Sequence, residues 1–335
     1  MNDVMIRERT QPGPWAQMRA RIVQIFSIPT VGPLLALVLT SAFFTSQTDR
    51  FLTGQNWSLI VQQVVVVGTL AIGQTLVILT AGIDLSNGMV LAFSSVILTS
   101  FAVNYGMNPL LAIFCGLLLA TAFGLLNGAL VALVRLPPFI VTLGTLNIAF
   151  AAVRIYTTTT IANLPATIIA LGNTFDVGQT AITYGSVFML LLYLLFWFIL
   201  SQTAWGRHVY AIGNNPEATR LAGISTTRLL ISVYTIAGLL YGIAGLLLVA
   251  RTQVGDPQAG QTANLDSITA VVLGGTSLFG GRGNIMGTLI GALIVGIFRN
   301  GLLLIGIPSI YQVLITGVLV ILAVSVDQLS HRGQA

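Results

Sequence analysis

A short polar segment in the second half of the chain, residues 215–223, has the signals of a helix with fixed ends. Asn215 can cap the helix N-terminus, Pro216 suits the first helical position, and Glu217 favours the positive end of the helix dipole. Gly223 suits the C-terminal stop. A short helix held rigidly between two apolar runs can act as a lever that a cytoplasmic motor pushes. The simpler interpretation is a solvated interfacial helix.

A second segment, Ala81–Gly88, breaks an apolar run with two glycines, an aspartate and a serine. Non-helical backbone at membrane depth is tolerated only where protein or a water-filled cavity covers it, so the break predicts a pathway. Alternatively, Asp84 lies at the inner end of a span and caps a helix that begins near Ser86. A proton-relay role for Asp84 is a third interpretation, but no second acid or histidine lies near it in the sequence.

A related pattern returns in the segment Gly274–Gly283, which contains Ser277. Broken helices at corresponding places are the usual sign of a duplicated transporter half, although three matched positions do not establish one. The matched residues are Gly82, Leu85 and Gly88 in the first segment and Gly275, Leu278 and Gly281 in the second.

Further polar side chains lie inside apolar runs. The amides of Gln62, Gln63 and Gln74 can donate and accept hydrogen bonds, which suits a polyhydroxy ligand. Thr142 and Asn147 follow a pair of prolines in another run, and helix–helix hydrogen bonding is the simpler account of them. We therefore expect these residues to line a path of weak contacts or to hold helices together.

The composition limits the class of protein. Of 335 residues, 23 are charged and 55% are hydrophobic, whereas a soluble globular domain carries about 25% charged residues. All 14 basic residues are arginine, so a phosphate-binding loop of the GxxxxGK type is excluded. The lone cysteine, Cys115, excludes a disulfide or a cysteine metal site within one chain. The net charge of +5 indicates no nucleic-acid partner, because membrane proteins gather arginines on the cytoplasmic side.

Uncharged apolar stretches of about 20 residues locate the membrane spans. The sequence predicts an all-α integral membrane protein with about ten transmembrane helices, some of them broken or re-entrant. The expected spans lie near residues 29–46, 59–80, 88–104, 110–134, 138–156, 184–202, 229–250, 266–280, 285–305 and 309–326. The eighth is the weakest, because glycines interrupt a stretch that is short for a regular crossing.

Arginine counts in the short loops set the orientation. They place both termini in the cytoplasm, together with the segment 206–227, and they place the loop 157–183 outside. The chain then divides into a cytoplasmic tail, 1–28, a single transmembrane domain, 29–327, and a second tail, 328–335. No catalytic residue and no metal site is expected.

Four stretches and the C-terminal run together resemble a known family, the permease subunits of bacterial ABC importers for monosaccharides of the ribose, xylose, arabinose and galactose type. The resemblance covers most of residues 60–327. The matching stretches are AGIDLSNG (81–88), LPPFIVTLGTL (136–146), GRHVYAIGNNPEATRLAGI (206–224), GGTSLFGGRGNIMGTLIGALIVG (274–296) and IYQVLITGVLVILAVSVD (310–327). The chain departs from the usual pattern at Asn87, Met89 and Arg299.

The resemblance implies a transport subunit in the bacterial inner membrane that is not itself an enzyme and carries no cofactor. ATP and Mg would bind a separate ATPase, a second permease copy or paralogue would complete the channel, and a periplasmic protein would deliver the sugar. It assigns ATPase coupling to Asn215, Pro216, Glu217, Ala218, Arg220, Leu221 and Gly223. We expect the translocation path beside Gln62, Gln74, Gly82, Asp84, Phe139, Thr142, Asn147, Gly275 and Ser277.

Two alternatives remain open at this stage. A related ABC permease would carry a nucleoside, a branched amino acid or a sugar-like signal molecule by the same mechanism. A self-sufficient proton-coupled transporter would need an ionisable pair inside the spans, and only Asp84 is a serious candidate.

Overall fold

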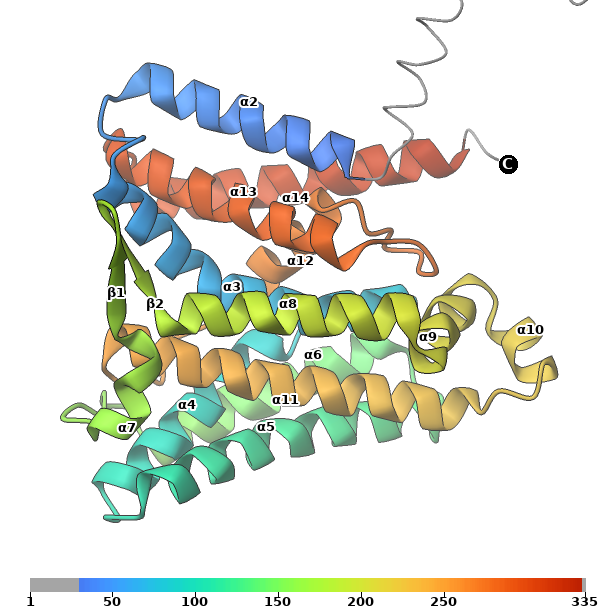
Figure 1. Cartoon of the computed structure of the whole chain (residues 1–335). Coiled ribbons are helices and arrows are strands. Elements are labelled where there is room, and N and C mark those ends of the chain that lie inside the picture. Colours follow the sequence, from blue (N-terminus) through green and yellow to red (C-terminus); the bar gives the residue numbers. More distant parts are fainter. Residues whose placement is uncertain (1–29, 333–335) are drawn as a thin grey trace, which may run out of the picture.

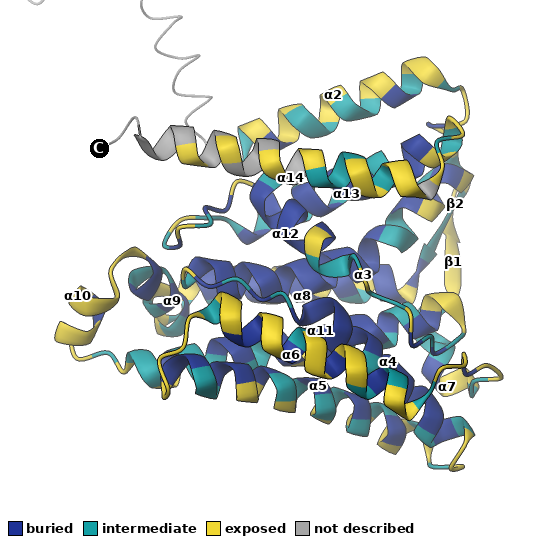
Figure 2. Ribbon diagram, turned by 180° about the vertical axis from the view of Figure 1, so that it is seen from behind, coloured by how far each residue is buried: buried dark blue, intermediate teal, exposed yellow. Residues whose placement is uncertain are grey.

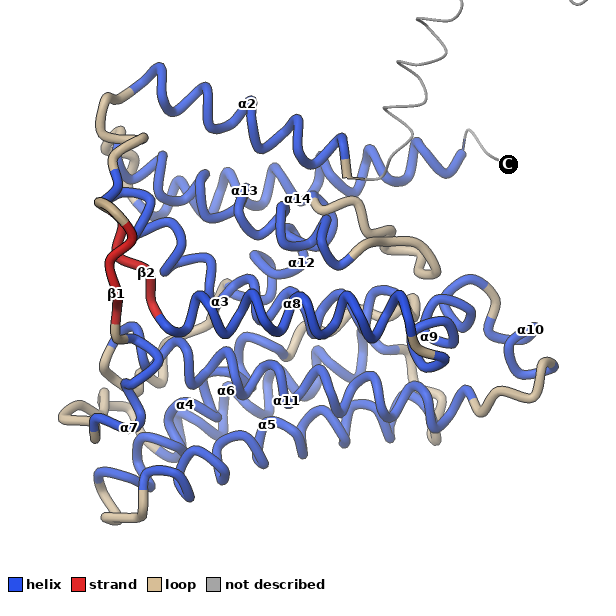
Figure 3. The backbone as a smooth tube through the Cα atoms, in the orientation of Figure 1, coloured by secondary structure: helices blue, strands red, loops and turns tan. Residues whose placement is uncertain are grey.

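The computed structural model describes residues 30–332 and shows a bundle of helices with one small hairpin (Figure 1; Figure 3). The expected tail 1–28 lies outside the described residues. The helices are α2 (Val31–Gln47), α3 (Gly54–Leu79), α4 (Asn87–Val103), α5 (Pro109–Ala132), α6 (Pro138–Tyr156), α7 (Ala166–Ile169), the short 3-10 helix η1 (Ala170–Gly172), α8 (Tyr184–Gln202), α9 (Ala204–Asn214), α10 (Pro216–Leu221), α11 (Thr226–Thr252), α12 (Ala263–Leu273), α13 (Ile285–Leu304) and α14 (Ser309–Arg332). Strands β1 (Thr174–Val177) and β2 (Thr180–Thr183) pair antiparallel.

Each expected span overlaps a helix, although the eighth, 266–280, extends past the end of α12 into a turn, and the helical membrane class is confirmed. Within the described residues, six helices are long and apolar enough to cross a membrane: α3, α5, α6, α8, α11 and α13. Helices α2, α4 and α12 are apolar but shorter, with 17, 17 and 11 residues. Helix α14 continues to Arg332 and so includes residues 328–332, which were expected in the C-terminal tail.

The segments that lead into the short helices α4 and α12 have similar backbone features. The long helices α3 and α11 each end next to a non-glycine residue with a left-handed backbone, Ala81 at φ 60° and Gln253 at φ 58°. An aspartate then accepts a hydrogen bond from the backbone N–H two residues further on, at 2.8 Å in both Asp84 and Asp256. The segments 80–86 and 253–262 therefore occupy corresponding places in the fold. The segment Gly274–Gly283, which matches Ala81–Gly88 in sequence, does not correspond to it in the fold.

Helix packing repeats the same correspondence. Helix α5 packs against α11 as α13 packs against α3, and α4 contacts α5 and α6 as α12 contacts α13 and α14. The bundle therefore contains two similar groups of helices, α3–α6 and α11–α14. Repeats of this kind place their broken helices near the middle of the membrane.

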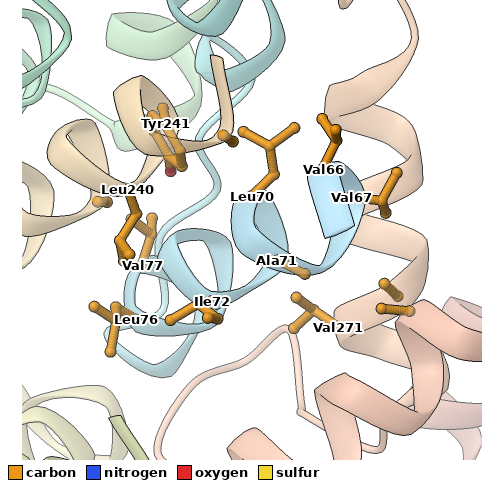
Figure 4. Close-up of a cluster of buried hydrophobic side chains, with 14 of the residues drawn as sticks. Val66, Val67, Leu70, Ala71, Ile72, Leu76, Val77, Leu240, Tyr241 and Val271 are labelled. Atoms are coloured by element: carbon orange, nitrogen blue, oxygen red, sulfur yellow. The ribbon is translucent and has the colours of Figure 1, made fainter. Parts of the chain in front are cut away.

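The core is formed where these groups meet. Helix α3 is buried along most of its length, and Val77 lies beside Leu240 and Tyr241 of α11, while Val271 of α12 lies close to α3 (Figure 4). Helices α5 and α6 instead keep one exposed apolar face (Figure 2). This difference follows from their places, because α3 is central and α5 and α6 lie at the edge.

The two ends of the bundle differ. Helices α9 and α10 lie at one end, together with the beginning of α2 and the end of α14, and the β1–β2 hairpin and α7 lie at the other (Figure 1). Trp205 of α9 donates to Ser232 of α11 at 2.9 Å, which holds this connection against the bundle. The segment 206–227 and the two ends of the described chain therefore share one end.

A close backbone contact between the first turn of α4 and the second break provides the first test. A Cβ added at Gly88 would collide with the Gly260 carbonyl oxygen, and a Cβ at Gly260 would collide with the Gly88 carbonyl oxygen. We expect Gly88→Val to destabilise the solubilised protein by about 1–3 kcal/mol, because this backbone contact must open. The thermal unfolding midpoint in detergent measures the effect.

Gly144 of α6 is the matched control, since a Cβ there would meet nothing within 4 Å. Gly144→Ala should leave the unfolding midpoint unchanged or raise it slightly. An unchanged unfolding midpoint for Gly88→Val would contradict the close backbone contact between Gly88 and Gly260.

Candidate translocation site

A buried polar cluster surrounds the N-terminus of α4. Asp84 and Asn87 are both fully buried. One Asp84 oxygen accepts hydrogen bonds from the Ser86 hydroxyl at 2.6 Å and the Ser86 N–H at 2.8 Å. The Asn87 amide donates to Gln74 Oε1 at 3.0 Å and to Ser267 Oγ at 2.9 Å. These bonds join the start of α4 to α3 and α12.

Other helices provide partners for the same broken segment. The Thr142 hydroxyl of α6 donates to the Ile83 carbonyl at 3.0 Å, and Asn264 of α12 donates to the Leu85 carbonyl at 3.2 Å. Asn127 of α5 donates to Ser86 Oγ at 3.1 Å. Polar side chains thus satisfy backbone groups that a regular helix would satisfy by itself.

A recess of about 270 Å³ opens beside this cluster and is called the amide recess below. Asn147 is exposed there, and its amide nitrogen bonds only the Leu143 carbonyl of its own helix, at 2.9 Å. The recess is lined by Leu85, Met89, Leu146, Asn147, Phe150, Gly260, Gln261 and Asn264. Three amides beside an aromatic ring are groups that can contact the hydroxyls and the face of a sugar.

A larger cavity of about 470 Å³, called the charged cavity below, lies on the other side of residues 260–263. Arg299 of α13 forms an ion pair with Asp266 of α12 at 2.7 Å and donates to Thr262 at 3.3 Å. The polar residues that line the charged cavity are Gln63, Arg251, Thr262, Asp266, Arg299 and Gln312. The remaining lining is mostly aliphatic.

The glycine segment Gly274–Gly283 lies elsewhere, at the end of the bundle that carries α9. Its Gly281 N–H donates to the Leu79 carbonyl at 2.9 Å, and the Tyr210 hydroxyl of α9 donates to the Gly283 carbonyl at 3.1 Å. A Cβ at Gly213 of α9 would collide with the Leu79 carbonyl oxygen and the Gly281 nitrogen. This three-way contact connects α9 to the end of α3 and to the turn between α12 and α13.

The structure places the expected path residues in several different surroundings. Gln74, Asp84 and Thr142 belong to the buried cluster, and Asn147 lines the amide recess. A Cβ at Gly82 would lie 2.5 Å from the Tyr234 hydroxyl, so this glycine faces protein. The remaining expected residues line neither the amide recess nor the charged cavity. Gln62 borders a small gap near Gly172, and Phe139 is 52% exposed on the first turn of α6. Gly275 and Ser277 lie in the turn between α12 and α13.

The expected short helix is present as α10, with its predicted ends. Asn215 accepts a hydrogen bond from the Ala218 N–H at 2.9 Å, Pro216 is the first helical residue, and Gly223 has φ +82°. Arg220 donates two hydrogen bonds to Glu217, and these bonds together with the attraction between the charges lower the pKa of Glu217. All seven residues expected to couple to an ATPase are exposed, whereas Thr219 between them is buried.

Sequence comparison identifies the family. Residues 56–324 match the sequence model of a family described as branched-chain amino acid transport system / permease component. The chain belongs to this permease family. It is 48% identical to the fructose import permease protein of Rhizobium meliloti over 91% of this chain and 86% of that protein.

Two further relatives are also sugar permeases by name. The permease is 39% identical to the ribose import permease protein of Bacillus subtilis, over 89% of this chain and 92% of that protein. It is 33% identical to the L-arabinose ABC transporter permease protein of Azospirillum brasilense, over 98% and 97% of the two chains. No solved structure matches the permease significantly.

Sequence reasoning missed the charged cavity of the permease. Neither Arg251 nor Asp266 is among the site residues expected from the sequence, and Arg299 is named there only as a departure from the resembled pattern. The signal for this cavity in the sequence is Arg299, which lies within the apolar run 285–305. An ionisable residue inside a membrane span is a functional-site candidate and usually has a charged or polar partner. Arg299 and Asn87, where the permease departs from the resembled pattern, both make polar contacts in the interior.

The bond from Thr142 to the broken segment gives a second test. Thr142→Val keeps the side-chain shape but leaves the Ile83 carbonyl without this donor, so we expect a loss of about 1 kcal/mol in unfolding free energy. Thr145→Val is the matched control, because its hydroxyl bonds only carbonyls of its own helix. Equal unfolding midpoints of the two variants in detergent would show that the bond to Ile83 contributes nothing.

Proposed function

We propose that this permease is the membrane subunit of an ABC importer that carries a monosaccharide across the bacterial inner membrane. Ten helices, α2–α6, α8 and α11–α14, would cross the membrane, with both termini in the cytoplasm. The names of the relatives support the substrate class, since they include fructose, ribose, L-arabinose and D-allose transport proteins.

The observation that carries the proposal is the exposed, capped helix α10 at one end of the bundle. An exposed Leu221 beside an exposed Glu217–Arg220 pair offers apolar and polar contacts to another protein. Helix α9 precedes α10 directly and contacts Leu79 and Gly281, so a push on α10 reaches the end of α3, next to the break 80–86, and the turn between α12 and α13. An ATPase subunit that binds ATP and Mg is the partner proposed for this surface.

The membrane path is proposed to run along the exposed side of α6. The side chain of Asn147 faces outward there and donates to the Leu143 carbonyl of its own helix. A polar amide that faces lipid is unfavourable, so a second permease copy or paralogue would enclose it. The amide recess would then offer weak contacts to a passing sugar. A periplasmic binding protein would deliver the sugar at the end that carries the β1–β2 hairpin.

The family description names branched-chain amino acids and so favours a second candidate substrate. The deciding experiment is transport by the permease reconstituted in proteoliposomes with its ATPase and binding protein. We expect ATP-dependent uptake of a monosaccharide and no uptake of leucine. Uptake of leucine without any monosaccharide would overturn the proposed substrate class.

Helix α10 gives a third test. Glu217→Arg replaces attraction to Arg220 with repulsion, and Gly223→Leu places a side chain on a left-handed backbone position. Both variants should reach the membrane in normal amounts and lose most ATP-dependent uptake, measured with a radiolabelled sugar. Normal uptake by both would exclude α10 as the coupling element.

The lowered pKa of Glu217 predicts how coupling depends on pH. A carboxylate whose pKa falls below its ordinary value stays ionised until the pH drops through the lowered pKa, so its pair with Arg220 is intact above that point. Uptake should therefore show no change attributable to Glu217 between about pH 5.5 and 7.5. The comparison uses the uptake profile of Glu217→Gln, which should have the same shape across this range.

Cysteine labelling tests the orientation in a Cys115→Ala background. A cysteine at position 160, beside the α6–α7 connection, should react with an impermeant reagent added to intact spheroplasts, and a cysteine at position 218 in α10 should not. The reverse pattern would invert the proposed topology and would place α10 out of reach of a cytoplasmic ATPase.

A further inference from the structure

The polar lining of the charged cavity comes from five helices and the segment before α12. Gln63 comes from α3, Arg251 from α11, Asp266 from α12, Arg299 from α13 and Gln312 from α14. Thr262 comes from the segment that leads into α12. Its volume of about 470 Å³ lies in the range of small-molecule sites, which is about 300–1,000 Å³.

Two charged side chains of this cavity, Asp266 and Arg251, have hydrogen-bonding atoms without a partner in the described protein. Asp266 is only 1% exposed, and its Oδ1 atom has no hydrogen-bond partner, although Oδ2 pairs with Arg299. Within the described part of the chain, the Arg251 guanidinium forms no ion pair or hydrogen bond, and it is an exposed donor at the cavity wall. The buried Asp266 oxygen without a partner is unfavourable unless a ligand or water donates to it, and the exposed Arg251 guanidinium is available to the same ligand.

We propose that the charged cavity is a discrete binding site for a neutral monosaccharide within a single permease copy. The inference rests on the proposed function and adds a site to it. Sugar hydroxyls both donate and accept hydrogen bonds, which matches the free oxygen of Asp266, the free donors of Arg251 and the amide of Gln63. An anionic group would be attracted to Arg251 but could not donate to the Asp266 Oδ1 atom, whereas a sugar hydroxyl can.

The position of the site also gives it a role in transport. Thr262 and Asp266 line the cavity, and Gln261 and Asn264, from the same turn of chain, line the amide recess. A sugar in the charged cavity therefore contacts one side of the entrance to α12 while the other side borders the proposed path. A bound sugar would hold the segment 260–266 in the arrangement seen in the structure.

The test measures sugar binding without the binding protein. The permease and its ATPase are reconstituted in lipid nanodiscs, and equilibrium binding of radiolabelled D-fructose and D-ribose is measured. We expect saturable binding of at least one sugar, weakened about tenfold or more by Arg251→Gln and by Gln63→Ala, because each removes a hydrogen bond from the ligand. Arg50→Gln is the matched control, since Arg50 is exposed and lines neither recess.

Asp266→Asn should weaken binding as well, and the unfolding midpoint shows whether this variant remains folded. If it does not, Arg251→Gln decides the question, because the Arg251 side chain has no partner within the described protein to lose. Unchanged affinity in Arg251→Gln would overturn the site, as would tighter binding of D-gluconate than of either sugar.

The transport assay separates this failure from failure of the proposed function. A complex that imports a monosaccharide with its binding protein, but binds no sugar in its absence, would remove the site and leave the function. A complex that imports no monosaccharide at all would remove both.

Discussion

The need to satisfy backbone hydrogen bonds away from water governs this structure. Two segments, 80–86 and 253–262, leave the helical conformation between apolar helices, so their N–H and C=O groups need partners that the helix ladder no longer provides. Side chains from α6 and α12 supply partners for two carbonyls of the first break, and the second break contacts the first turn of α4 where Gly260 meets Gly88. The rest of the bundle is arranged around this contact.

The same constraint explains why the two inner helices are short. Helices α4 and α12 begin after the breaks rather than at a membrane surface, so 17 and 11 residues suffice for them. Each lies against the long helix of the other group, α4 against α11 and α12 against α3, and against the following pair of helices. The result is two similar groups of helices whose interrupted segments meet.

Polar residues inside this bundle serve different purposes according to their partners. Hydrogen bonds to neighbouring helices and to the broken segment are formed by Gln74, Asn87 and Thr142. These residues therefore hold the broken segment in place. Asn147 bonds its own helix and faces outward, whereas Arg251 and Asp266 retain free groups in a cavity. Gln74 Nε2 and Asn87 Oδ1 also lack partners, but these residues line neither recess. Unused bonding capacity that faces a cavity therefore distinguishes the candidate ligand contacts from the structural ones. This distinction also directs the proposed sugar site to the charged cavity.

The sequence by itself determined the helical membrane class, the positions of the apolar helices and the short helix α10. These depend on local chemistry: the lengths of apolar runs, the Asn215 cap, Pro216 at the first helical position and Gly223 after the helix. It also located the break at Ala81–Gly88, because glycines and an aspartate in an apolar run need protection from lipid.

Only the tertiary structure decided which residues meet. The sequence paired Gly82 with Gly275 by spacing, but the corresponding breaks are 80–86 and 253–262, because helix order and packing define the repeat rather than glycine spacing. The charged cavity joins residues from α3 to α14, and the ion pair between Asp266 and Arg299 spans two helices. Contacts between distant segments depend on how the helices pack, which no local pattern in the chain specifies.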